Sequence, residues 1–336
     1  MNTVGINVIK IAHIALAEGV FKGHPSETAI TKVIDEGLTQ GSPLELCNAE
    51  IILRALHEQG FDSKGFQDKL TKDFLKNHSA VRLHISTSPT YLSALQNLND
   101  LIRCQNTCHT PTITEEDGVL DWNTFFTTPL TALHRNHISY VKKTIFNLFP
   151  LENQGLTPPP APFETLLWNE KTSLRNAIGD DVFLKLPLLF TLRKKDVQKE
   201  NPFSNPVEHK RLTRLKPHLY PTSLNPGLNR TYSNNTLDQI AIAYKNHQPT
   251  HLKNIATNLA FSEATLKRKL AVEKNSFLEI KTLFRMNQSL ILLLRRLEIS
   301  DICDRLDYAS GSSFSRKFKN WYRISPSQFL KRYDAD

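Results

Sequence analysis

The stretch ICDRLDYASGSSFSRKF, residues 302–318, decides the fold because a second copy of its pattern lies earlier in the chain. Residues 255–261, IATNLAF, align with residues 302–308 at an offset of 47, and residues 266–270 align with residues 314–318 at an offset of 48. Apolar residues at helical spacing predict a helix, a tight turn and a second helix in each copy. This arrangement, with basic residues on the second helix, is the helix-turn-helix pattern.

The outer face of each second helix carries residues suited to DNA bases. Arginine can bond a guanine edge with two hydrogen bonds, serine donates or accepts, and a small residue allows close approach. A solvated face is the simpler interpretation of one copy, but two copies in register favour DNA recognition. The residues opposite the apolar positions are Ala264, Lys267 and Arg268 in the first copy, and Gly311, Ser312, Ser315 and Arg316 in the second.

The basic charge of the chain is concentrated in its last third. The 336 residues carry a formal net charge of +9, and residues 236–336 hold +7 of it, with 17 Lys and Arg against 10 Asp and Glu. Residues 221–235, rich in Pro, Asn, Ser and Thr, have the composition of a linker. We therefore expect an N-terminal domain at 1–220, a linker at 221–235 and a basic domain at 236–336, which suggests a nucleic acid partner.

A long helix is expected to join the two copies. The first helix-turn-helix is predicted at about 252–271, the connecting helix at about 276–296 and the second helix-turn-helix at about 299–319. A helix of about 20 residues is roughly 30 Å long. Successive major-groove faces are about 34 Å apart, so this helix could hold both second helices on one side of the duplex.

Residues 236–336 resemble the DNA-binding domain of the AraC/XylS family of transcription regulators. The resemblance rests on IATNLAFSEATLKRKL (255–270) and on residues 299–332, including FSRKFK and the Ser325-Pro326 step. It implies an all-α domain that places two recognition helices in adjacent major grooves, with Lys319 contacting a phosphate. It also implies a transcription regulator, such as an activator, whose partners are double-stranded promoter DNA and RNA polymerase. Asp307 and Arg323 replace glycines usual in the family, and Asp tolerates the turn conformation well enough for the turn to persist.

The first 220 residues predict an α+β domain. A helix follows Pro89, VLDW at 119–122 is a strand, and residues 181–193 have an extended pattern. Together with STSPTYLSALQNLNDLIR, FETLLW and FTLRKKDVQKENPFSNP, these features are similar to the arabinose-binding-like N-terminal domain of ornithine-utilisation-regulator-type members. That resemblance implies effector sensing or homodimerisation. Trp122, Phe125 and Trp168 are effector-binding candidates, although ordinary core positions are the simpler interpretation.

The sequence offers only weak evidence for a metal site or a catalytic site. Cys104, Cys108 and His109 lack a second ligand pair at a recognised spacing, so we expect neither a metal nor a cofactor. No phosphate-binding loop or nucleophile elbow occurs, and we expect no enzyme activity. Two alternatives stay open: a repair enzyme that uses Cys104 or Cys108 and carries an appended DNA-binding domain, and a regulator whose N-terminal domain only dimerises. The longest apolar run has five residues, which predicts a cytoplasmic protein without a membrane span.

Overall fold

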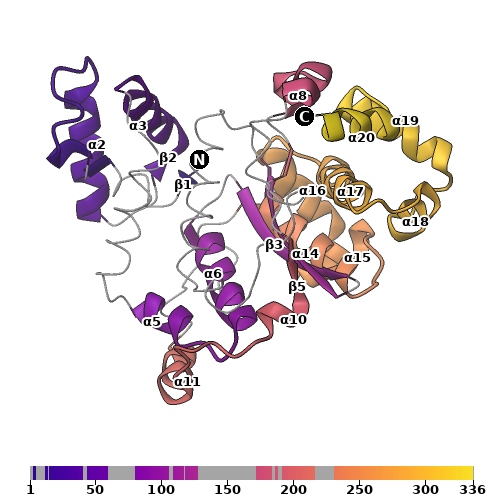
Figure 1. The fold of residues 1–336 in the computed structure, drawn as a ribbon, viewed down its shortest axis with the longest axis horizontal. Helices are drawn as coiled ribbons and strands as arrows, with labels where there is room; N and C mark the ends of the chain where they lie inside the picture. The colour runs from indigo at the N-terminus through magenta and orange to yellow at the C-terminus, as the bar shows by residue number, and fades with distance from the viewer. Residues whose placement is uncertain are drawn as a thin grey trace. The chain divides into compact units, whose positions relative to one another are not determined.

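The structure is a computed structural model that forms two compact units (Figure 1). It describes residues 3–4, 12–13, 15–40, 44–59, 80–105, 109–116, 118–127, 172–183, 186–187, 191–215 and 231–335. The first unit combines Met1–Pro111 with Leu130–Pro158 and Arg193–Arg230. The second joins Thr112–Pro129 and Pro159–Leu192 to Thr231–Asp336. The units are therefore not consecutive blocks of sequence, because two segments from the first 220 residues belong with the basic region.

The described chain is mostly helical, with two small sheets. Strands β1 (Thr3–Val4) and β2 (Leu44–Glu45) pair in antiparallel fashion. The other sheet has the order β3-β4-β5, formed by His109–Glu116, Val119–Phe126 and Thr191–Arg193. The predicted VLDW strand is confirmed as the start of β4. No helix in the described residues is long and apolar enough to cross a membrane.

Helices dominate the first unit. Their bounds are α2 Glu27–Gln40, α3 Leu46–Glu58, α5 Ala80–Ser86, α6 Tyr91–Gln105, α10 Lys194–Val197 and α11 Pro206–Arg214. The helix predicted after Pro89 is α6, which begins at Tyr91. It buries Leu95, Leu98 and Ile102, so the helical spacing of its apolar residues identifies its packed face.

Two stretches that are far apart in the sequence bind each other in the first unit. The buried side chain of Asn201 donates from its amide nitrogen to the carbonyls of Ser86, at 2.7 Å, and Ser88, at 2.9 Å. Its backbone N–H donates to the carbonyl of Pro89 at 3.0 Å. These bonds satisfy backbone groups where the chain leaves α5, and such groups would be costly to bury unpaired. Asn201 therefore fixes the turn between α5 and α6.

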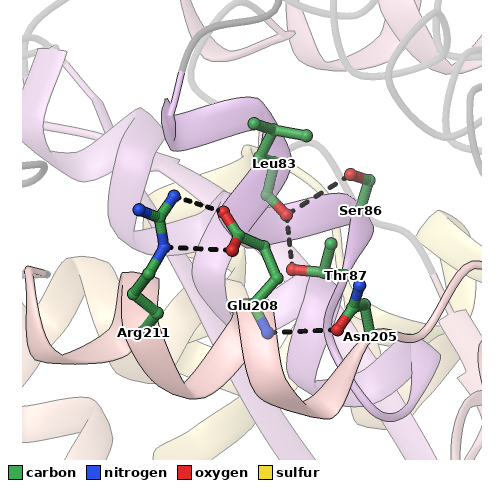
Figure 2. Close-up of polar contacts among 6 residues, drawn as sticks. All are labelled: Leu83, Ser86, Thr87, Asn205, Glu208 and Arg211. Carbon is green, nitrogen blue, oxygen red and sulfur yellow. Dashed lines mark hydrogen bonds and ion pairs between the residues drawn. The ribbon is translucent and has the colours of Figure 1, made fainter.

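Local hydrogen bonds then define the start of α11 beside α5 (Figure 2). The side-chain oxygen of Asn205 accepts from the backbone N–H of Glu208 at 3.1 Å, which is a standard N-cap. Arg211 donates to both carboxylate oxygens of Glu208, at 2.6 and 3.0 Å. Directly after α5, the hydroxyl of Thr87 donates to the carbonyl of Leu83 at 2.6 Å, and that carbonyl also accepts from the backbone N–H of Thr87 at 2.9 Å.

The second unit contains the basic region and two segments that precede it. From the earlier segments come α8 (Thr172–Ile178) and α9 (Asp180–Phe183) as well as β4. The basic region forms α14 Tyr232–Lys245, α15 Leu252–Asn258, α16 Glu263–Val272, α17 Phe277–Leu294, α18 Ile299–Arg305, α19 Gly311–Tyr322 and α20 Pro326–Ala335.

Two local predictions differ from the structure. Residues 231–235, placed in the linker by composition, are the cap and first turn of α14, and residues 221–230 lie outside the described part of the chain. The α14 helix starts here because Thr231 caps it and because the carboxylate of Glu273 accepts from the N–H groups of Tyr232 and Ser233, at 2.6 and 2.8 Å. The extended pattern at 181–193 is wrong at its start, where α9 forms, and correct at its end, in β5.

Two hydrophobic cores support the basic region. One lies between α14, α15, α16 and the first half of α17, and it includes Phe125 from β4. The other is a chain of aromatic contacts in the second copy of the repeat. Its ring centroids lie 4.6–5.8 Å apart along Tyr308, Phe314, Phe318, Tyr322 and Phe329. Phe314, Phe318 and Phe329 are fully buried, and these contacts hold α19 against α20.

Candidate nucleic-acid interface

The first candidate recognition helix is α16, and its local sequence explains its start and its orientation. The hydroxyl of Ser262 caps it by accepting from the backbone N–H of Thr265 at 3.1 Å. Leu266 and Leu270 are fully buried and hold one face against the core. The predicted contact residues lie on the other face, where all three are exposed: Ala264, Lys267 and Arg268.

The second candidate recognition helix, α19, repeats this plan. Ser310 caps it by accepting from the N–H of Ser313 at 3.2 Å, and Phe314 and Phe318 are fully buried. Four of the predicted contact residues point away from this core. Ser312, Arg316 and Lys319 are exposed, and Ser315 is half-buried. Within the described residues, neither Arg268 nor Arg316 has an ion-pair partner, so both guanidinium groups are available to an anion.

Gly311 has a different environment from the other predicted contacts. A Cβ atom at this position would lie 3.1 Å from the Cγ2 atom of Ile299, at the start of α18. That distance is shorter than ordinary van der Waals contact, so a larger residue would require Ile299 or α19 to shift by a few tenths of an ångström. The small size of Gly311 therefore suits its contact with Ile299, which the sequence pattern alone did not indicate.

The tight turns before both recognition helices use a left-handed residue. Ala260 has φ +58° in the first copy and Asp307 has φ +54° in the second, at equivalent positions of the repeat. The expectation that the turn persists with Asp307 in place of glycine is confirmed. Residues with a Cβ atom are strained in this region, and Asp less so than most. Each turn therefore carries a small conformational cost that its neighbours offset.

A cation covers the aromatic residue that follows each turn. In the second copy, Arg285 from α17 lies 3.9 Å from the ring centroid of Tyr308 and donates to the carbonyl of Asp307 at 2.7 Å. Burial raises the pKa of Tyr308, and the nearby Arg285 charge opposes that rise. In the first copy, Lys269 lies 5.2 Å from the ring centroid of Phe261 and nearer, at 4.1 Å, to that of Tyr232. The sequence analysis did not single out Arg285, although an arginine on the predicted connecting helix was a candidate partner for the second turn.

The helix α17, which joins the two candidate recognition helices, is nearly as long as one groove repeat of B-DNA. It has 18 residues, a length of about 27 Å. A complete capping box begins it, because Ser276 and Glu279 each accept from the other's backbone N–H. This length is close to the roughly 34 Å between successive major-groove faces on one side of B-DNA.

Of the other predicted site residues, the structure describes the side chains of Trp122 and Phe125. Trp122 and Phe125 are fully buried, and the Phe125 ring meets Phe284 edge-on at 5.9 Å, so Phe125 is part of the core. Trp168 and Cys108 lie outside the described residues, and the structure does not describe the side chains of Cys104 and His109. Among the described residues, no group of three or more His, Cys, Asp and Glu side chains could hold a metal.

Comparison with known proteins gives this region its class. The family model described as a helix-turn-helix domain matches residues 255–332, which span α15 to α20. These residues are a helix-turn-helix domain. The match does not extend to residues 1–254.

The helix-turn-helix domain is similar to parts of several regulators. The virulence regulon transcriptional activator VirF of Shigella flexneri is 35% identical over 79 residues, which are 23% of this chain and 30% of VirF. An uncharacterized HTH-type transcriptional regulator of Mycobacterium tuberculosis is 34% identical over 80 residues, which are 24% of this chain and 23% of that protein. The chain thus spans less than a third of these relatives. The matches support the AraC/XylS type for the domain.

One solved structure aligns over more of the chain. The transcriptional regulator CdpR from Pseudomonas aeruginosa is 16% identical and covers 84% of this chain and 91% of its own, with a TM-score of 0.34. That score is too low to transfer geometry, so the assignment rests on residues 255–332.

Proposed function

We propose that the chain is a sequence-specific transcription regulator of the AraC/XylS type that binds promoter DNA through α16 and α19. The observation that carries this proposal is the duplicated arrangement. Two serine-capped helices each bury a pair of apolar residues and expose an arginine, Arg268 or Arg316, without an ion-pair partner in the described chain. A solvated surface does not require the same arrangement twice, whereas reading two successive major grooves does.

The two classes of contact have different energetic roles. A well-placed arginine on a guanine edge discriminates against the wrong base by about 1–3 kcal/mol. Lysine contacts to phosphate, as proposed for Lys319, supply affinity that falls with salt and carries no sequence information. The net charge of +7 in residues 236–336 would provide the salt-dependent affinity for phosphates, and the two recognition helices would provide the discrimination between bases.

The N-terminal two thirds would bias DNA binding, either through a small effector or by joining two copies of the chain. RNA polymerase would be the further partner, and the cytoplasm the compartment. A thermal-shift screen against amino acids, sugars and fatty acids separates the first two roles. A ligand that raises the melting temperature supports a sensor, and a dimer without any such ligand supports a dimerising domain.

The direct test is selection of bound DNA from a random pool by the purified full-length chain. We expect a motif in two segments whose centres lie about 10–10.5 base pairs apart, one segment for each recognition helix. An Arg268→Ala, Arg316→Ala double variant is the negative control, and Lys245→Ala removes an exposed charge at the end of α14 as the matched control. No enrichment by the unmodified chain would overturn the proposal.

A further inference from the structure

A pocket of about 430 Å³ lies between α8 and α20, which Figure 1 shows side by side in the second unit. Pockets of about 300–1,000 Å³ are typical of small-molecule sites. The lining residues are Ser173, Asn176 and Ala177 of α8 and Arg332 of α20. Ser173 and Arg332 are 159 residues apart in the sequence, so the pocket is formed by the fold and not by one local segment.

The α8 wall of this pocket is held in place by residues that do not line it. Ser173, Asn176 and Ala177 are spaced by three and four residues, so they share one side of the helix. Leu174 and Ile178 are fully buried, and α8 packs against both α9 and α20. A ligand would therefore meet a wall that is already formed, which lowers the entropic cost of binding.

The polar groups of the pocket suit a negatively charged ligand. Arg332 donates from one guanidinium nitrogen to the hydroxyl of Ser173 at 3.2 Å, and this bond orients its remaining N–H groups. The side chain of Asn176 is exposed and adds an amide donor. A guanidinium binds a carboxylate or a phosphate through paired, charge-assisted hydrogen bonds. The pocket thus offers donors of the right kind for an oxyanion, and none of its four lining residues is acidic.

The acidic residues around the pocket are already paired with other arginines. In the described parts of α8, α9, α19 and α20 there are three of them, and each has its own partner. The pairs are Asp180 with Arg175, Asp181 with Arg323, and Asp334 with Arg296. Arg332 has no ion-pair partner within the described residues, so its charge is available to an anion from solution.

We propose that this pocket binds a small oxyanion, either an organic acid or a phosphorylated compound, with Arg332 as the partner of its anionic group and Asn176 as a second donor. A water molecule takes about 30 Å³ of the liquid. The pocket therefore has room for a carbon skeleton beside the oxyanion. A backbone phosphate of DNA has the same chemistry, but α8 lies outside the helix-turn-helix domain, and a concave pocket suits a free compound better. This inference goes beyond the proposed function and does not depend on DNA binding.

Isothermal titration calorimetry of the full-length chain tests the site, with inorganic phosphate, citrate and glycerol 3-phosphate as probes and the ionic strength kept constant with sodium chloride. Calorimetry is preferred to a thermal shift because phosphate and citrate stabilise proteins in general through their exclusion from the surface. We expect at least one probe to bind at a single site. Arg332→Gln should weaken that binding by about tenfold or more, since it removes hydrogen bonds between charged groups.

Two further variants separate the pocket from general charge effects. Asn176→Asp places a carboxylate in the pocket beside the guanidinium, so it should weaken probe binding as much as Arg332→Gln does while Arg332 remains. Lys331→Gln removes the same charge from the neighbouring exposed residue of α20 and should leave probe binding unchanged. Absence of binding by all three probes, or equal weakening by Arg332→Gln and Lys331→Gln, would overturn the site.

The recognition helices provide the comparison with DNA. The Arg268→Ala, Arg316→Ala double variant should keep its affinity for the probe, because neither residue lines the pocket. Loss of probe binding in that variant would assign the anion to the recognition helices and contradict the proposal. A fall of about one in the salt slope of DNA binding in Arg332→Gln, with probe binding unchanged, would assign Arg332 to a DNA phosphate and contradict it as well. If no DNA site can be selected, the proposed function fails while calorimetry still decides the pocket.

Discussion

Replacing Arg295 by Met should destabilise the protein far more than the same change at the next residue. Arg295 pairs with Asp121, whose side chain is 2% exposed, so Arg295→Met leaves a buried carboxylate without its cation. Breaking such a pair costs about 3–5 kcal/mol. Arg296 pairs with Asp334, and those side chains are 52% and 50% exposed, so Arg296→Met should cost at most about 1 kcal/mol.

Urea denaturation of the full-length chain, followed by far-UV circular dichroism, measures the difference in the free energy of unfolding. The double variant Asp121→Leu, Arg295→Met replaces the buried pair by apolar side chains and should recover most of the loss, because removing both charges also removes their desolvation cost. Equal destabilisation by Arg295→Met and Arg296→Met would refute the packing of β4 on α17. A double variant as unstable as the single one would refute the electrostatic explanation.

Four further substitutions probe the helix-turn-helix domain. Ala260→Gly and Asp307→Gly should each stabilise it by about 0.5–1 kcal/mol, because relief of left-handed strain exceeds the entropy cost of glycine; lower melting temperatures in both would contradict the turn assignment. Phe318→Ala should cost about 3–5 kcal/mol and abolish DNA binding, since the ring is fully buried among aromatic neighbours; a variant with normal thermal unfolding would refute that core. Burial raises the pKa of Tyr322 well above 10.0, so its contribution to stability is complete below pH 10 and is lost as the pH rises toward the folded pKa. Tyr322→Phe should therefore flatten the alkaline decline in stability, and an unchanged slope above pH 10 would contradict it.

The second helix of each repeat copy could be predicted because its capping residue and its spacing of apolar residues indicate the same helix. Ser262 and Ser310 occupy cap positions, and the buried Leu266, Leu270 and Phe314 recur at helical spacing. Local propensity, capping and hydrophobic pattern therefore indicate the same structure. The exposed faces follow from the same spacing, so the contact candidates on them could be named without coordinates.

The role of Gly311 and the start of α14 could not be predicted because they depend on residues distant in the sequence. Gly311 lies against the side chain of Ile299 from another helix, which leaves little room for a Cβ atom. The start of α14 depends on Glu273, which lies about 40 residues later and accepts from two N–H groups of the first turn. Composition alone assigned that turn to a linker, since Asn, Ser and Thr favour loops and helix caps alike.

The division into units was equally hidden from the sequence. Asp121 and Phe125 lie on the same face of β4 and look like ordinary strand residues, yet they contact Arg295, the C-cap of α17, and Phe284 of α17. Neither contact could be predicted from the neighbouring sequence, because a sheet face and a helix face pack together only after both have formed. For the same reason, the hydrogen bonds from Arg323 to Asp181 and to the carbonyl of Ile178 could not be predicted from the sequence.

The most direct measurement of the central claim is DNA selection repeated with Arg268→Ala and Arg316→Ala, each as a single variant. If α16 and α19 read separate segments, Arg268→Ala loses base preference in one segment only, and Arg316→Ala loses it in the other, about one helical turn away. Each variant should weaken binding to the selected site by about 1–3 kcal/mol while its melting temperature stays unchanged. Loss of the same base positions in both variants, or no loss in either, would contradict two recognition helices.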